Sequence, residues 1–144
     1  GSHDERGPYM AGLRWLVRRL GLGEAVTFTG QVSNEQRGAY YRGCRVYVTM
    51  SEHEGFCVPV VEAMHLGQPV VAFASSAVPE TVGEAAVLVE AKRYDLIGEA
   101  IALLAAETPL RARLVAKGPA QARRYAPEAI EARFAGMLSE ALGG

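Results

Sequence analysis

The chain has 144 residues, 49% of them hydrophobic and 22% charged, and its formal net charge is −1 at pH 7. These values fit one globular domain, or a piece of a larger one, with enough apolar residues to bury a core. They exclude a strongly basic surface for nucleic acid or an anionic membrane. No apolar run approaches the roughly 20 residues that a membrane-spanning helix needs.

The first two thirds of the chain predict helices that alternate with short strands. Apolar residues recur at helical spacing over 7–23, with Pro8 near the start and Gly21 or Gly23 as the stop. Short β-branched and aromatic runs predict strands at 25–30, 45–50, 69–74 and 86–90. The segments between them predict helices at 33–44 and 59–67 and a short helix or turn at 78–85.

Alternation of this kind predicts an α/β fold, a Rossmann-like parallel sheet flanked by helices. The loops that follow parallel strands meet at one edge of such a sheet, where ligands bind. Residues 94–144 form an all-helical segment with breaks at prolines, and we expect it to pack on the sheet as part of a single domain, 1–144. The chain opens on a helix and has only four predicted strands. We therefore expect a fragment that lacks its first strands, and the opening Gly-Ser-His fits either a tag remnant or native residues.

The segment SEHEGFCVPVVEAMHLG, residues 51–67, places two glutamates on either side of a loop-to-helix junction. Pro59 suits the first turn of a helix, where its missing N–H is no loss, so a helix is predicted to begin near Val58. Free N–H groups at a helix N-terminus, with the dipole behind them, bind anions. Glu54 precedes this turn and Glu62 follows it. The two acids bracket an anion site, as a nucleotide sugar requires with its hydroxyls on both sides of a diphosphate.

This segment resembles the E-x7-E signature of retaining glycosyltransferases of family 4 (group 1). The resemblance covers roughly residues 9–104 and includes VTFTGQVSNEQ and SSAVPETVGEAAVLV. It implies the C-terminal, nucleotide-sugar-binding half of a GT-B fold. The enzyme would transfer a sugar from a nucleoside-diphosphate sugar to an unknown acceptor, with neither a metal nor another cofactor.

The resemblance also implies the partners and the location. A glycan, lipid or small-molecule acceptor would bind an N-terminal domain that the chain lacks, and no nucleic-acid partner is expected. The two cysteines, Cys44 and Cys57, do not make a disulfide framework. A cytoplasmic enzyme is therefore expected, with a peripheral position at the inner membrane face as a further option.

Residue roles follow from the same resemblance. Glu54 would be catalytic, beside the donor sugar, and Glu62 would accept hydrogen bonds from the ribose hydroxyls. The backbone of four residues would hold the diphosphate and sugar: Gly55, Phe56, Cys57 and Val58. Three residues would be candidates for the nucleobase: Val32, Asn34 and Arg37.

Two departures from the family pattern bear on the donor site. Many family members have glycine where Cys57 stands, which is tolerable if only the N–H matters. The arginine and lysine that grip the diphosphate would come from a loop upstream of residue 1. Lys92 and Lys117 are the only lysines in the chain, and their late position argues against their replacing that pair.

Other interpretations of the same residues remain open. The two glutamates could be solvated surface acids. The run Glu52-His53-Glu54 could suggest a metal site with His65, although the ligands are few and no HExxH spacing exists. Cys57 could be a nucleophile if His53 served as its base. A GT-B nucleotide-sugar epimerase and a non-catalytic Rossmann-like binding module are the alternative functions.

Overall fold

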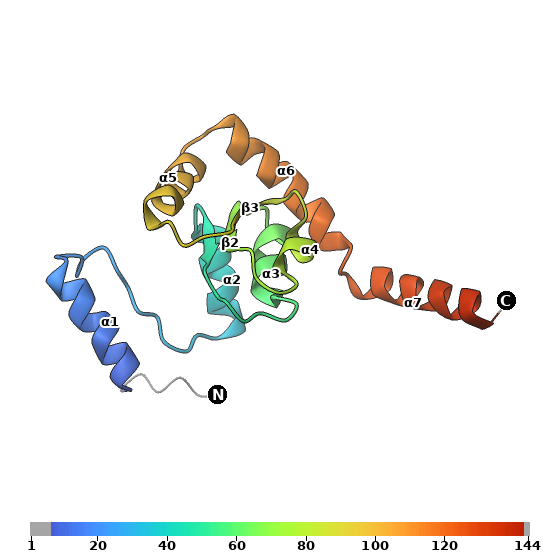
Figure 1. Cartoon of the computed structure of the whole chain (residues 1–144), viewed down its shortest axis with the longest axis horizontal. Helices are drawn as coiled ribbons and strands as arrows, with labels where there is room; N and C mark the ends of the chain where they lie inside the picture. Colours follow the sequence, from blue (N-terminus) through green and yellow to red (C-terminus); the bar gives the residue numbers. More distant parts are fainter. Residues whose placement is uncertain (1–6, 143–144) are drawn as a thin grey trace. The chain divides into compact units, whose positions relative to one another are not determined.

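A computed structural model describes residues 7–142 (Figure 1). Residues 1–6, with the Gly-Ser-His start, and residues 143–144 lie outside the described residues. The chain divides into two units, Gly1–Arg37 and Gly38–Gly144, which are described separately. Along the described chain the elements are α1 (Pro8–Arg19), α2 (Asn34–Gly43), β1 (Tyr47–Thr49), α3 (Val58–His65), β2 (Val70–Phe73), α4 (Val78–Val82), β3 (Ala86–Val89), α5 (Tyr94–Ala105), α6 (Pro109–Arg123) and α7 (Pro127–Leu142).

The first unit confirms the predicted N-terminal helix, and the strand predicted after it is wrong. Helix α1 begins at Pro8 and stops before Gly21, whose φ of 68° is a left-handed conformation that glycine adopts without strain. Residues 26–30 are not in a strand. The N–H groups of Ala25 and Val26 instead donate to the Leu22 carbonyl and close a turn. A β-branched run becomes a strand only when a neighbouring strand accepts its backbone hydrogen bonds.

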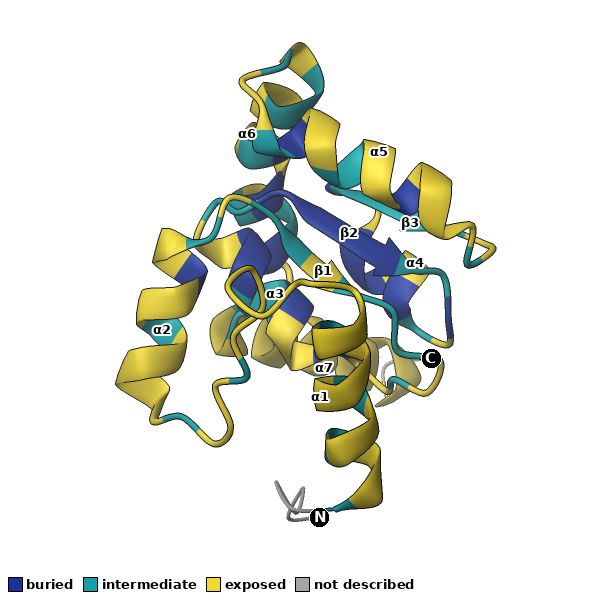
Figure 2. Cartoon of the chain, turned by 90° about the vertical axis from the view of Figure 1, so that its left-hand side faces the viewer, coloured by how far each residue is buried: buried dark blue, intermediate teal, exposed yellow. Residues whose placement is uncertain are grey.

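The second unit contains a three-stranded parallel sheet in the order β1-β2-β3, and its strands confirm three of the four predicted ones (Figure 2). Val71 pairs with Val48 on one side and with Val87 on the other. The central strand is the most buried, with Val70, Val71 and Ala72 fully enclosed. Apolar runs of this kind suit parallel strands because helices cover both of their faces.

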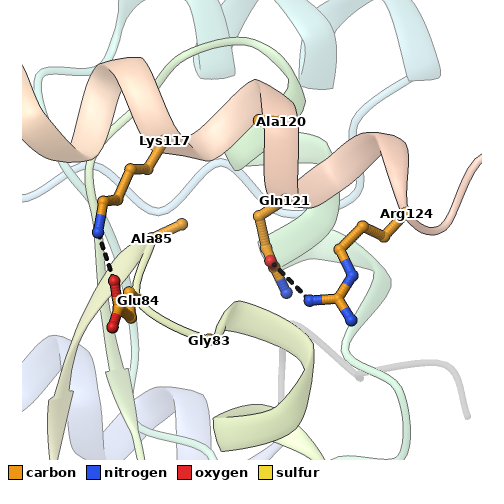
Figure 3. Close-up of a pocket in the computed structure, with 7 residues that line it drawn as sticks. All are labelled: Gly83, Glu84, Ala85, Lys117, Ala120, Gln121 and Arg124. Atoms are coloured by element: carbon orange, nitrogen blue, oxygen red, sulfur yellow. Dashed lines mark hydrogen bonds and ion pairs between the residues drawn. The ribbon is translucent and has the colours of Figure 1, made fainter.

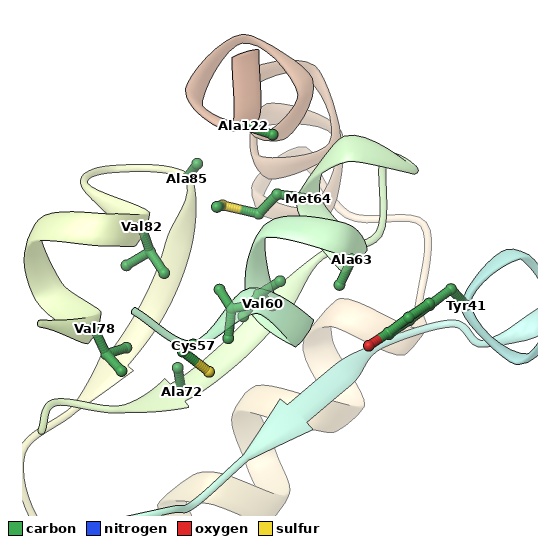
Figure 4. Packing of buried hydrophobic residues seen from close by; sticks show 11 residues of the cluster. Tyr41, Cys57, Val60, Ala63, Met64, Ala72, Val78, Val82, Ala85 and Ala122 are labelled. Atoms are coloured by element: carbon green, nitrogen blue, oxygen red, sulfur yellow. The ribbon is translucent and has the colours of Figure 1, made fainter. Parts of the chain in front are cut away.

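Helices α3 and α4 cover one face of the sheet, and helices α5 and α6 contribute the core of the other. On the first face Val60 and Met64 of α3 pack against Ala72 and against Val82 of α4 (Figure 4). On the second face Leu104 of α5 and Leu114 of α6 pack with Val71. The sheet is thus enclosed, and its carboxyl edge carries the loops that follow β1, β2 and β3.

The C-terminal segment is helical as predicted, except that it is not broken at Pro119. Helix α6 begins at Pro109 and is capped by Thr108, whose hydroxyl oxygen accepts from the Arg111 N–H at 3.2 Å. The helix continues through Pro119. Proline disfavours a helical residue before it mainly through that residue's Cβ, and Gly118 has none. Packing of α6 against α3 holds the remaining turns. Helix α7 has no buried residue.

Candidate functional site

The start of helix α3 lies where the sequence predicts it and has an unusual backbone. The helix begins at Val58, with Pro59 in its first turn. The residue before it, Cys57, has φ 57° and ψ 61°, a left-handed conformation that costs a non-glycine residue roughly 1–2 kcal/mol. No side-chain cap hydrogen bond closes this end, and the Val60 N–H donates to the Cys57 carbonyl at 3.0 Å. The turn therefore presents backbone N–H groups and the positive end of the helix dipole to an anion.

The predicted site residues of the second unit lie on one continuous loop and helix at the carboxyl edge of β1. Glu54 and Glu62 are both half-buried, and the Oε2 atom of Glu62 is buried. Phe56 and Val58 are exposed. A Cβ added at Gly55 would meet no atom within 4 Å, so the loop leaves open space there. The two carboxylates thus flank an open turn that ends in a helix N-terminus.

Tyr47, which sequence reasoning missed, lies among these acids. It is on β1, packs on the α3 side of the sheet, and its ring centroid is 5.6 Å from that of Tyr41. Burial first, and then the negative charges of Cys57, Glu54 and Glu62, raise the pKa of Tyr47 to about 12. The phenol therefore stays protonated at neutral pH and can only add a neutral hydroxyl to the site. The strand pattern placed Tyr47 on one face, and no motif marked it.

The Cys57 thiol does not have the surroundings of a nucleophile. Burial raises its pKa, a hydrogen bond from the Val60 backbone lowers it, and the neighbouring Glu54 carboxylate raises it again by its charge and as a hydrogen-bond acceptor. Reactive cysteines instead lie in electropositive, accessible places that lower the thiol pKa. The Cys57 thiol is therefore protonated at neutral pH, which argues against a nucleophilic role.

Long-range contacts from three segments of the chain hold the loop between β1 and α3. The Ser75 hydroxyl, after β2, donates to the Ser51 carbonyl at 2.9 Å. The Thr81 hydroxyl, on α4, donates to the Phe56 carbonyl at 3.3 Å. Lys92, after β3, pairs with Glu52 at 2.7 Å between Nζ and Oε1. The loop that carries Glu54 is therefore fixed by segments that follow it in sequence by 24 to 40 positions.

The ion pair places Lys92 beside the loop that follows β1, despite its late position in the sequence. Its ammonium lies beside the loop of Glu52 and also 5.1 Å from the centroid of the Phe73 ring. Parallel strands return the chain to the same edge of the sheet, so residues far apart in sequence meet there. Lys117 is different, because it pairs with Glu84 at the amino end of β3.

We predict that Lys92→Met raises the pKa of the Glu52 carboxyl to its ordinary range. The Lys92 side chain holds that pKa below the ordinary value, first by its hydrogen bond and then by its charge. The stability that this pair contributes is present above the ordinary pKa of a glutamate and is lost as the pH falls through the lowered one. Carboxyl-carbon NMR titration of Glu52 would measure the change, with Lys117→Met as the control. An unmoved Glu52 titration in Lys92→Met would show that the pair does not form in solution.

The three nucleobase candidates lie in the first unit. Their segment begins with the predicted capping box, since the Gln36 N–H donates to the Ser33 hydroxyl at 3.2 Å and the Ser33 N–H donates to the Gln36 side chain at 2.9 Å. Val32 is half-buried, and Asn34 and Arg37 are exposed. These three residues belong to the first unit and the two glutamates to the second. Their role stays a prediction.

Two features of the described chain bear on the metal and membrane alternatives. Within residues 7–142, no group of three or more His, Cys, Asp or Glu side chains is placed to hold a metal ion. His65 is exposed at the end of α3. Over the same residues, none of the helices combines the length and the hydropathy required to cross a bilayer.

A hollow of about 450 Å³ lies away from the two glutamates, between helix α6 and the turn from α4 to β3 (Figure 3). Lys117, Gln121 and Arg124 line it from α6, facing Glu84 on the turn. The turn lies at the amino end of β3, whereas Glu54 follows the carboxyl end of the parallel strand β1. The hollow is therefore separate from the predicted donor turn.

Comparisons with known proteins identify the family of the chain. The family described as "Glycosyl transferases group 1" matches residues 5–121. O-antigen chain mannosyltransferase B of Escherichia coli is 31% identical over 79% of this chain and 30% of its own length. A GDP-mannose-dependent alpha-(1-6)-phosphatidylinositol monomannoside mannosyltransferase of Mycobacterium tuberculosis is 32% identical over 79% of this chain and 31% of its own length.

A solved structure extends the comparison to the fold. The Anabaena protein HepE, in complex with UDP-glucose, matches 92% of this chain with a TM-score of 0.79 and 26% identity, over 37% of the HepE chain. The same protein has been solved with UDP. The chain belongs to the group 1 family of glycosyl transferases, and its fold is the Rossmann-like C-terminal half of a GT-B enzyme. It spans about a third of the length of these relatives.

Proposed function

We propose that the chain is the donor-binding domain of a retaining glycosyltransferase, which transfers a sugar from a nucleoside-diphosphate sugar to an acceptor. The observation that carries the proposal is the uncapped N-terminus of α3 at the carboxyl edge of a parallel sheet, with Glu54 before it and Glu62 one turn inside it. Membership of the glycosyl transferase family favours a transferase over an epimerase or a non-catalytic module.

The roles of the residues follow from the charges on the donor. The diphosphate, an anion, binds the backbone of residues 55–58, where the N–H groups and the helix dipole offer positive charge. Glu62 accepts hydrogen bonds from the ribose hydroxyls. Glu54 lies beside the donor sugar, where positive charge builds on the ring as the diphosphate leaves. The proposed site uses no metal, and Val32, Asn34 and Arg37 remain the candidates for the base.

The nucleotide sugars named for the relatives indicate which donors to test first. One relative depends on GDP-mannose, and HepE binds UDP and UDP-glucose. These two nucleotide sugars are therefore the first donors to test. The acceptor, a glycan, a lipid or a small molecule, binds a separate domain of the complete enzyme. Cys44 and Cys57 are both free thiols, which fits a cytoplasmic enzyme, and an acceptor at the inner membrane face suits that location.

We expect Glu62→Ala to weaken binding of UDP or GDP by about 10- to 150-fold. A hydrogen bond to a charged group is worth about 1.5–3 kcal/mol, and loss of the carboxylate removes such bonds to the ribose. Isothermal titration calorimetry on the complete protein would measure the change.

Glu99→Ala is the matched control, because Glu99 is an exposed glutamate on α5 and that helix packs on the opposite face of the sheet from α3. Its affinity for the same nucleotide should match that of the wild type. A folded Glu62→Ala protein that binds the nucleotide as tightly as the wild type would remove Glu62 from the site.

A further inference from the structure

Cys57 holds a backbone conformation that its own side chain disfavours. Among the described residues that are not glycine, only Cys57 and Ser76 have a positive φ. A conformation of this kind persists where the surrounding structure imposes it. The contacts that impose it on Cys57 should therefore be found on the neighbouring peptide groups.

The peptide group between Phe56 and Cys57 is held from one side. Thr81 is 2% exposed, and its hydroxyl donates to the Phe56 carbonyl at 3.3 Å. This carbonyl and the Cys57 N–H belong to one planar, trans peptide group, so they point in opposite directions. When Thr81 fixes the carbonyl toward α4, it also fixes the Cys57 N–H away from α4. That N–H is one of the groups that the turn offers to an anion.

Helix α6 completes the support together with Tyr125, which lies two positions after its last residue. The Tyr125 ring meets the Phe56 ring edge-on, with centroids 4.8 Å apart and an interplanar angle of 71°. The Tyr125 hydroxyl donates to the Glu80 carbonyl at 3.1 Å. Gln121, on α6, donates to the Thr81 carbonyl at 2.9 Å. Two contacts therefore tie α6 to α4, and α4 and Tyr125 each contact Phe56.

We propose that Thr81 and Tyr125 are positioning residues of the donor site, which hold the Phe56–Cys57 peptide so that the Cys57 N–H faces the donor diphosphate. This inference rests on the proposed function. Neither residue touches the donor. Thr81 acts through the Phe56 carbonyl, and Tyr125 acts through the Phe56 ring and the Glu80 carbonyl.

The first test separates phosphate binding from general damage to the fold. Thr81→Val keeps the shape of the side chain and removes the hydroxyl. We expect it to weaken binding of UDP and GDP by about 3- to 10-fold, the range for one ordinary hydrogen bond. Binding of uridine and guanosine should not change, because these nucleosides carry no phosphate for the Cys57 N–H to meet. Calorimetry for the diphosphates and ligand-observed NMR for the nucleosides would measure both.

The second test uses the strain at Cys57. In a Cys57→Gly background the left-handed turn is no longer disfavoured, so loss of the Thr81 hydroxyl should disturb it less. We expect Thr81→Val to weaken UDP and GDP binding by less than about 3-fold in that background, a smaller loss than with cysteine in place. A role of Thr81 in overall stability alone would give the same loss in both backgrounds.

The third test concerns Tyr125. Tyr125→Phe keeps the contact with Phe56 and loses one hydrogen bond, whereas Tyr125→Ala loses both. Affinity for UDP and GDP should therefore fall further in Tyr125→Ala than in Tyr125→Phe. The phenylalanine variant should keep most of the wild-type affinity. Tyr94→Ala, at an exposed position on α5, is the control for removal of a tyrosine ring and should bind like the wild type.

Two results would overturn the inference while the proposed function stands. One is a Thr81→Val protein that binds diphosphates like the wild type. The other is one that loses nucleosides and diphosphates equally. If the wild type binds no nucleoside diphosphate, the proposed function fails, and the inference fails with it.

Discussion

Replacing Gly118 with valine is expected to lower the free energy of unfolding by about 3 kcal/mol, a typical cost of forcing a larger side chain into a filled interface. Gly118 is buried where α6 crosses α3. A Cβ there would stand 3.0 Å from the Met64 carbonyl oxygen and 3.4 Å from its Cα. Both are backbone atoms, so the helices would have to separate. Valine would also restore the Cβ that disfavours a helical residue before Pro119.

Gly98 offers a matched control on a neighbouring helix. It lies inside α5, and a Cβ at this position would meet no atom within 4 Å. Gly98→Ala should therefore raise the free energy of unfolding by up to about 1 kcal/mol, the difference in helix propensity between the two residues. Urea unfolding of both variants would measure the two changes in the free energy of unfolding, which should have opposite signs. A Gly118→Val protein as stable as the wild type would show that α6 does not approach α3 this closely.

The fold was predictable from the sequence wherever a local pattern was enough. The strands 45–50, 69–74 and 86–90 were recognisable because short β-branched runs between helices suit a covered parallel sheet. The same signal failed at 25–30, because composition does not report whether a neighbouring strand is present. At Pro119 the sequence predicted a break that the structure does not have. The helix continues because the preceding residue is glycine and because α6 packs against α3.

The candidate site divides in the same way. The start of α3 at Val58 was predictable because Pro59 suits the first turn of a helix. The only sequence signal for the left-handed conformation of Cys57 is the glycine that many family members have at this position. The contacts made by Thr81, Lys92 and Tyr125 had no signal, because each joins the loop to a residue at least 25 positions away. Such contacts depend on the assembled sheet and not on a motif.

Substitution of the two glutamates of the signature should affect different properties, nucleotide affinity for Glu62 and kcat for Glu54, because the two residues lie on opposite sides of the turn at the start of α3. Glu62→Ala should lose affinity for the nucleotide. Glu54→Gln should instead lower kcat by about 10²- to 10³-fold, as removal of one electrostatic group from a reacting centre typically does. Its affinity for UDP or GDP should change by less than about 3-fold, because a nucleoside diphosphate lacks the sugar beside which we propose that Glu54 lies.

Glu52→Gln is the matched control for the change at Glu54. It makes the same substitution two residues earlier in the loop, where the carboxylate is exposed and pairs with Lys92. The pair is exposed and screened by solvent, so its loss should lower kcat by less than about 5-fold.

Steady-state kinetics of the complete enzyme with saturating donor, alongside calorimetry with the nucleoside diphosphate, would separate the two effects. If Glu54→Gln lost affinity for the diphosphate and kept its kcat, Glu54 would be a binding residue. The charge that develops on the sugar ring would then have to be stabilised by another group.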